Sequence, residues 1–239
     1  TTFQYSAAAG KRHRLREAMV WIDGPSYYDP PGGVLTFTPD VPDALVFPKG
    51  GMNTSGHIAL INHQLRQIRS GLALAISLGR LLVLPEVTCG YDKAWYALSS
   101  GQAKGAFGGA HSFILPIRKC PLDHFLEVGP LHPLETLREY SFLSNPRTPE
   151  AVKKSVATAT VDLAQASAEV ERLATDFRGT KVLQIDNLAK IDATKLLTTT
   201  QRLSFRKRFL FASGSWCCAP NDDVKVGLPK SYRFSLMNA

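Results

Sequence analysis

The sequence predicts an α/β fold in which a Rossmann-like domain is built on a mainly parallel sheet. In the segment 56–79, apolar residues recur every three or four positions and so form one stripe of an α-helix: Ile58, Ile61, Leu65, Ile68, Leu72, Ala75 and Leu78. The wholly apolar run 81–84, closed by Pro85, is typical of a strand covered on both faces. A second apolar run, 44–47, precedes a glycine-rich loop before the helix. Strand, loop, helix and strand form a βαβ unit.

The segment before this unit is expected to be the end of another domain. A helix is predicted over 11–21, with Leu15, Ala18, Met19 and Ile22 facing inward, and the glycine and proline at 24–25 end it. The segment 27–33 is a turn-rich linker, and 34–37 predicts a strand. We therefore divide the chain into residues 1–33 (the tail of an upstream domain and a linker), 34–220 (the Rossmann-like α/β domain) and 221–239 (a loose tail).

The later elements follow from the same patterns. Gly79 suits the left-handed end of the first long helix, and the glycine-rich segment 90–110 predicts a long loop. Short strands are expected at 113–115 and 125–128. A second long helix is expected over 149–177, with Thr148 as its cap and Pro149 near its first position. A strand at 181–185, a basic helix over 192–209 and a final strand at 211–216 complete the prediction.

The glycine-rich loop is the first candidate site. Gly50, Gly51 and Asn53 precede the helix N-terminus, where free N–H groups favour an anion, and His57 begins the helix. The third glycine of the dinucleotide-binding fingerprint is not evident. The loop is therefore either a plain connection or a loop that faces a phosphate or a sugar.

Composition limits the function classes. The 239 residues carry a net charge of +8, with basic clusters at 11–16 and 202–208, and a basic surface attracts phosphates. Aromatic residues do not alternate with these clusters, which disfavours nucleic acid. No run of 18 apolar residues is present, so the chain itself holds no membrane-spanning segment. The four cysteines form no Cys-x-x-Cys pair, and Cys89 and Cys120 flank the glycine-rich segment 90–110 as a candidate disulfide.

Four segments carry a specific resemblance to a known family. They are TTFQYSAAAGKRHRLREAMVWIDGPSYYDPPGG, HIALINHQLRQIRSGLALAISLGRLLVLP, CPLDHFLEV, and REYSFLSNP with the following PEAVKKS. They resemble the plant and green-algal arabinosyltransferases of glycosyltransferase family 77, and the terminal SWCC matches in kind. The resemblance implies transfer of arabinose from a UDP-sugar to glycans on hydroxyproline-rich, extensin-type cell-wall glycoproteins in the Golgi lumen.

The resemblance also implies parts that this sequence lacks. Such enzymes are similar to GT-A-type transferases, in which an Asp-x-Asp pair holds a divalent cation (Mn or Mg) on the donor diphosphate. This sequence contains no Asp-x-Asp. We therefore expect the metal ligands and a membrane anchor upstream, and we expect the chain to be inactive alone.

Within the first resembling segment, Lys11, Arg12 and Arg14 are candidates to hold the diphosphate, because cationic donors bind phosphate oxygens strongly. Gln4 and Glu17 are weaker donor-binding candidates. The alternative for all of them is a solvated, basic helix face.

The candidates for acceptor or anion binding lie further along the chain. Asn62 and Gln67 before LGRLLVLP resemble the opening of the Rossmann-like half of protein O-fucosyltransferases, which implies a half domain that binds acceptor peptide or glycan. Arg66 and Arg69 then contact a ligand or form surface salt bridges. Trp95 stacks on a sugar ring or lies buried beneath its loop.

Asp123 and His124 are the remaining candidate catalytic pair. Histidine is an acid or base near neutral pH, but a structural hydrogen bond is its commoner role. Two other functions stay open. One is a non-catalytic module that binds glycans or hydroxyproline-rich peptides, and the other is a basic domain that binds nucleic acid.

Overall fold

The computed structural model describes residues 7–52, 54–90, 98–99, 102–103, 118–120, 122, 126 and 137–214. A five-stranded sheet lies at its centre, and every strand pair in it is parallel. The strands are β1 (Val34–Thr36), β2 (Leu81–Val83), β5 (Leu137–Arg138), β6 (Val156–Ala159) and β7 (Val182–Ile185). Their order in the sheet is β5-β2-β1-β7-β6. The predicted α/β fold is confirmed.

The βαβ unit consists of β1, α4 (Thr54–Leu78) and β2, with Val34 beside Leu81 in the sheet. The predicted helix is confirmed, and its stripe residues Ile61, Leu65, Ile68, Leu72 and Ala75 are all buried. Gly79 has the expected left-handed backbone, with φ of +62°. The prediction of a strand at 44–47 is wrong: α3 (Asp43–Val46) occupies it, with Asp43 in its first turn. A single buried side chain, Val46, anchors α3, so this run does not need two covered faces.

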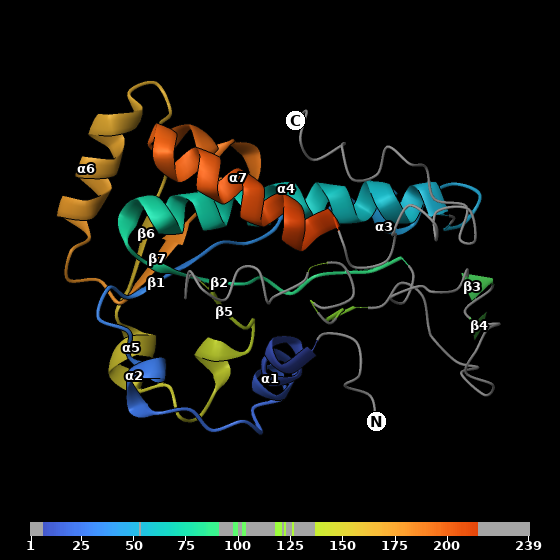
Figure 1. The fold of residues 1–239 in the computed structure, drawn as a ribbon, viewed down its shortest axis with the longest axis horizontal. Helices are drawn as coiled ribbons and strands as arrows, with labels where there is room; N and C mark the ends of the chain where they lie inside the picture. The colour runs from blue at the N-terminus through green and yellow to red at the C-terminus, as the bar shows by residue number, and fades with distance from the viewer. Residues whose placement is uncertain are drawn as a thin grey trace.

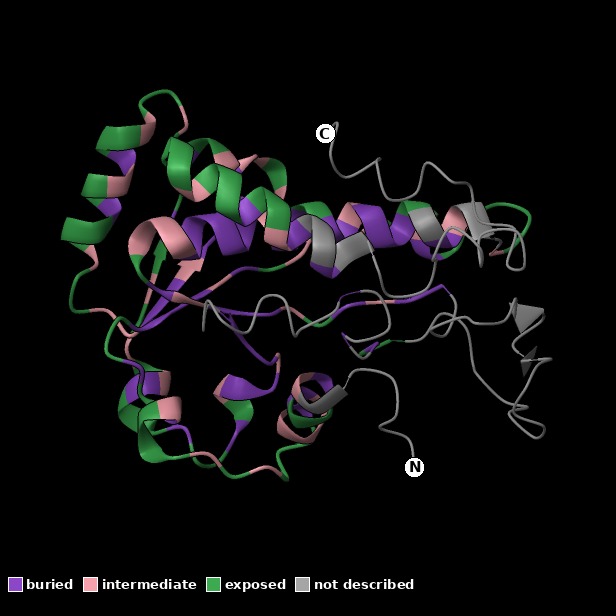
Figure 2. Ribbon diagram, viewed as in Figure 1, coloured by how far each residue is buried: buried purple, intermediate pink, exposed green. Residues whose placement is uncertain are grey.

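Helices cover both faces of the sheet (Figure 1). The long helix α4, with α6 (Ala166–Asp176) and α7 (Thr199–Gly214), lies over one face, and α1 (Ala7–Glu17), α2 (Pro25–Tyr28) and α5 (Glu150–Lys154) lie on the other. The larger apolar core lies between α4 and the sheet, where α4 is buried over much of its length (Figure 2). A smaller core of Tyr28, Val34, Val83, Phe142, Val152 and Val182 fills the opposite side.

The predicted helix over 149–177 is wrong, because the segment forms α5, then β6, then α6. Val156 and Thr158 are β-branched residues that favour a strand, and the parallel pairing with β7 supplies the backbone partners. Pro149 is the cap residue of α5, whereas the predicted cap, Thr148, donates its hydroxyl hydrogen to the carbonyl of Phe142 at 2.7 Å.

Other boundaries also differ from the predictions. The first helix ends at Glu17, and the Met19 and Ile22 side chains are 37% and 67% exposed rather than inward-facing. Met19 has φ of +58°, which a continuing helix does not allow. The basic helix is preceded by a 3-10 turn, η5 (Ala193–Leu196), and α7 runs to Gly214, so the predicted strand at 211–216 is wrong over 211–214.

The strand predicted at 181–185 is confirmed as β7, and η4 (Leu188–Lys190) follows it. Within 90–110, a short antiparallel pair joins β3 (Leu98–Ser99) and β4 (Gln102–Ala103). The strand predicted at 113–115 lies outside the described residues, and so does the one at 125–128 except for Leu126, which is in no strand. Among the helices described, none has the length and apolar character needed to span a bilayer.

Candidate functional site

A hollow of about 500 Å³ opens at the edge of the sheet where the parallel strands begin. Gly33 lies directly before β1, while Leu81 and Leu137 are the first residues of β2 and β5. The rest of the lining comes from α1, from the segment 23–33, from the turn after α4 and from the end of β5: Ala9, His13, Arg16, Asp23, Gly24, Ser26, Tyr27, Pro30, Pro31, Gly32, Gly79 and Arg138. The hollow therefore lies between the segment 9–33 and the start of the parallel strands.

A proline–glycine turn carries the chain past the hollow into β1. A Cβ atom on Gly32 would overlap the carbonyl oxygen of Gly79, and one on Gly33 would lie 2.6 Å from that of Lys181. Gly33 also has φ of +70°, a backbone conformation that glycine adopts at little cost. These two positions therefore require glycine for the close approach of three backbone segments.

Tyr27 is the centre of the polar cluster beside the hollow. The guanidinium carbons of Arg138 and Arg16 lie 3.9 Å and 4.3 Å from the centre of its ring, within the range of a cation–π contact. Its hydroxyl donates to Glu139 Oε2 at 2.5 Å, and Glu139 is 0% exposed. Burial, reinforced by the Glu139 carboxylate, raises the pKa of Tyr27 far above its ordinary value, so the phenol stays protonated.

The second polar contact is a fork between Arg16 and Asp23. Arg16 Nε donates to Asp23 Oδ2 at 2.7 Å, and Arg16 Nη2 donates to Oδ1. Trp21 Nε1 also donates to Oδ1, at 3.2 Å. Burial alone would lower the pKa of Arg16, but the hydrogen bond to Asp23 and the carboxylate charges of Asp23 and Glu139 raise it. Arg16 is therefore a permanent cation on the hollow wall.

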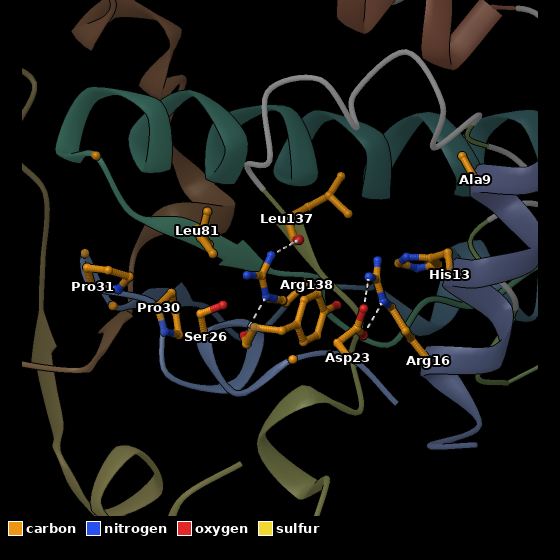
Figure 3. Close-up of a pocket in the computed structure, with 15 residues that line it drawn as sticks. Ala9, His13, Arg16, Asp23, Ser26, Pro30, Pro31, Leu81, Leu137 and Arg138 are labelled. Carbon is orange, nitrogen blue, oxygen red and sulfur yellow. Dashed lines mark hydrogen bonds and ion pairs between the residues drawn. The ribbon is translucent and has the colours of Figure 1, made fainter. Parts of the chain in front are cut away.

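Arg138 reaches the hollow from the sheet, on the side opposite α1 (Figure 3). Its Nε donates to the carbonyl of Tyr27 at 3.2 Å, and its Nη1 donates to the carbonyl of Leu137 at 3.1 Å. Burial lowers the pKa of Arg138, and the carboxylate charge of Glu139 opposes this shift only in part.

The predicted donor-binding residues have separate positions on α1. Lys11 and Arg12 are exposed, and the Arg12 guanidinium lies 5.3 Å from the centre of the Trp21 ring. Arg14 is half-buried, and Glu17 is buried with its Oε1 3.3 Å from His13 Nε2. His13 and Arg16, from the same basic cluster, line the hollow instead. Gln4 lies outside the described residues.

The predicted acceptor-binding residues are distributed along α4 and its preceding loop. Gly50 and Gly51 have φ of +88° and +85°, with open space where a Cβ would lie. His57 and Asn62 are buried, and burial lowers the pKa of His57 to about 4. Asn53 lies outside the described residues.

On the next turns of α4, Gln67 fixes the loop after β1. Its Oε1 accepts from the Asp40 amide at 2.9 Å, and its Nε2 donates to the Asp40 carbonyl at 2.6 Å. Arg66 is exposed, whereas Arg69 forms an ion pair with Asp192 at 3.6 Å. None of these α4 side chains lines the hollow. Trp95, Asp123 and His124 lie outside the described residues.

The predicted disulfide is confirmed. Cys89 and Cys120 are bonded, with 5.6 Å between their Cα atoms, and both are buried in the larger core. The bond closes a segment with a sequence separation of 31 residues.

The described residues do not fit a divalent cation. No group of three histidine, cysteine, aspartate or glutamate side chains with a suitable arrangement occurs among them. In the hollow, the Asp23 carboxylate is already bound by Arg16, and the neighbouring cations would repel a metal ion. We therefore assign no step of any reaction to a metal held by these residues.

No sequence pattern indicates Tyr27, Arg138 or Glu139 as residues of a site. A gap of 111 residues separates Tyr27 from Arg138, so no local spacing links them. The one sequence feature that links Tyr27 and Arg138 is the family resemblance, because they lie in the resembling stretches YYDPPGG and REYSFLSNP.

Comparison with known proteins supports that resemblance. The chain is 35% identical over 253 aligned positions to Arabinosyltransferase XEG113 of Arabidopsis thaliana. The alignment covers 92% of this chain but only 38% of that relative. No family model matches the chain, and no solved structure matches it. The predicted resemblance to plant arabinosyltransferases is confirmed.

Proposed function

We propose that this chain is the C-terminal part of an arabinosyltransferase that moves arabinose from a UDP-sugar to glycans on hydroxyproline-rich cell-wall glycoproteins. One observation carries the proposal: three of the four segments that resemble the family meet at the hollow. The first contributes the wall from Ala9 to Gly33, the second Gly79 and Leu81, and the fourth Arg138. Since the chain spans little more than a third of its relative, the activity is proposed for the longer protein.

In this proposal, the chain's own residues hold the substrate-facing surfaces in place. Residues 1–33 are the tail of the nucleotide-sugar transferase domain, fastened to the sheet by the contacts of Tyr27 with Arg138 and Glu139. A divalent cation on the donor diphosphate would be held by residues outside this chain. The chain alone would therefore be inactive.

The proposed site of action is the Golgi lumen. The Cys89–Cys120 disulfide supports this proposal, because such bonds form and persist in oxidising compartments of the secretory pathway.

Transfer of radiolabelled arabinose from UDP-arabinose to an extensin-type glycopeptide tests the proposal. The full-length protein should transfer the label, and the 239-residue chain should not. Transfer by the 239-residue chain alone would contradict the proposal that the chain is inactive without the rest of the protein. A full-length protein that binds the glycopeptide without modifying any acceptor would instead indicate a non-catalytic binding module.

A further inference from the structure

We propose that the hollow beside Tyr27 binds an oxyanion, a phosphate or carboxylate group, through Arg138 and His13. This inference concerns binding by the chain itself and does not require that arabinose is the sugar transferred. It rests on the hydrogen-bonding groups that line the hollow.

The carboxylate on the wall is already engaged. Asp23 is the one carboxylate among the lining residues, and both of its oxygens accept hydrogen bonds, from Arg16 and from Trp21. Tyr27 directs its hydroxyl hydrogen to Glu139, away from any ligand in the hollow. A ligand that mainly donates hydrogen bonds would therefore find few side-chain partners here.

The hydrogen-bond donors on the wall, by contrast, do not all have an acceptor among the described residues. Arg138 is 9% exposed, and two of its nitrogens donate to backbone carbonyls. Its third, Nη2, donates to no acceptor within the part of the chain that the structure describes. Enclosed guanidinium groups usually bind acceptors through both terminal nitrogens, and an oxyanion is the strongest such acceptor.

His13 supplies a second, independent observation on the facing wall. It is 3% exposed, and its Nε2 forms no hydrogen bond among the described residues, although Glu17 Oε1 lies 3.3 Å away. His13 and Arg16 extend from α1, while Arg138 extends from the sheet (Figure 3). A ligand seated between them would face nitrogen atoms on both walls of the hollow.

Charge and size agree with this ligand class. The lining carries two cations, Arg16 and Arg138, against the single anion Asp23; Glu17 and Glu139 are buried behind it and do not line it. The volume of about 500 Å³ admits a group larger than one phosphate. Two sources share this chemistry: the diphosphate of a nucleotide-sugar and the carboxylate of an acidic sugar.

Calorimetric titration of the 239-residue chain with pyrophosphate, UDP and glucuronate tests the proposal. We expect saturable binding of at least one of them, weakened at least tenfold by Arg138→Gln and by His13→Gln. Stronger binding of pyrophosphate and UDP would identify a phosphate ligand, and stronger binding of glucuronate would identify a carboxylate. Both results support an oxyanion site.

Arg147→Gln is the matched control, because Arg147 is exposed and its guanidinium bonds the Met19 carbonyl outside the hollow. Equal binding by all variants would show attraction to general basic charge and overturn the proposal, as would no binding of any probe at millimolar concentration. Circular dichroism confirms that each variant is folded, and if Arg138→Gln is not, His13→Gln decides. The arabinose-transfer assay is separate, so either proposal can fail without the other.

Discussion

The guanidinium carbon of Arg138 lies 3.9 Å from the centre of the Tyr27 ring, although 111 residues separate the two in the chain. Tyr27 belongs to the segment before the sheet, and Arg138 is the last residue of the edge strand β5. Their contact, with the Tyr27–Glu139 hydrogen bond, fastens the first described residues to the sheet and builds one wall of the hollow.

The Tyr27 hydroxyl should matter for stability. In Tyr27→Phe the ring stays between the guanidinium groups, but the buried Glu139 carboxylate loses its donor. We expect the free energy of unfolding to fall by about 1–3 kcal/mol, as measured by urea denaturation. The double variant Tyr27→Phe/Glu139→Gln should lose less than the sum of the two single variants, because it removes the enclosed charge as well. Strict additivity would show that the two groups do not interact.

Two glycines that both have a left-handed backbone conformation provide a matched test of steric overlap at the Cβ position. Gly33 and Gly50 both have positive φ, but only Gly33 is surrounded by backbone and side-chain atoms. Gly50→Ala should cost about 1–2 kcal/mol, the cost of a left-handed alanine. Gly33→Ala should cost about 1–3 kcal/mol more, because the new methyl group overlaps the Lys181 carbonyl. Equal thermal stability of the two variants would refute the close approach at Gly33.

Buried His57 should make stability depend on pH. Its pKa is lowered to about 4 by burial, against an ordinary value of 6.5, so the unfolded chain takes up a proton first as the pH falls. Stability should be full above pH 6.5 and decline toward pH 4 by about 1.4 kcal/mol per pH unit. Urea denaturation at several pH values should show this slope reduced by that amount in His57→Leu. An unchanged slope would contradict the assignment.

Removing the Cys89–Cys120 disulfide should lower the free energy of unfolding, because the unfolded chain then gains conformational entropy. Its two cysteines are 31 residues apart, a separation for which chain entropy predicts about 3–4 kcal/mol. The double variant Cys89→Ala/Cys120→Ala should therefore unfold at a lower guanidinium concentration than the wild type. A reductant should lower the midpoint of the wild type only. A reductant effect of similar size in the double variant would point to another disulfide.

Local sequence patterns predict correctly those helices and strands whose own spacing of apolar residues defines the face that they bury. The stripe from Ile61 to Ala75 predicted α4, since a helix with that spacing must bury one face. The run 149–177 misled because a helical stripe is also present where β6 pairs with β7, and that pairing is a tertiary contact.

The candidate site was only partly predictable for the same reason. The basic cluster at 11–16 is plain in the sequence, but the sequence does not show that His13 and Arg16, rather than Lys11 and Arg12, line a hollow. That distinction depends on the short helix ending at Glu17 and on the return of the chain through Tyr27. The contact between Arg138 and Tyr27 depends on the order of the strands in the sheet, and the spacing of residues along the sequence does not reveal that order.

The length of α4 has a mechanical consequence. Its 25 residues make one continuous rod of about 37 Å, which ends at the rim of the hollow beside Gly79. Because α4 is buried in the larger core along much of its length, it fixes the position of the rim at Gly79 relative to that core. Substitutions that loosen the packing of α4 should therefore also displace the rim of the hollow.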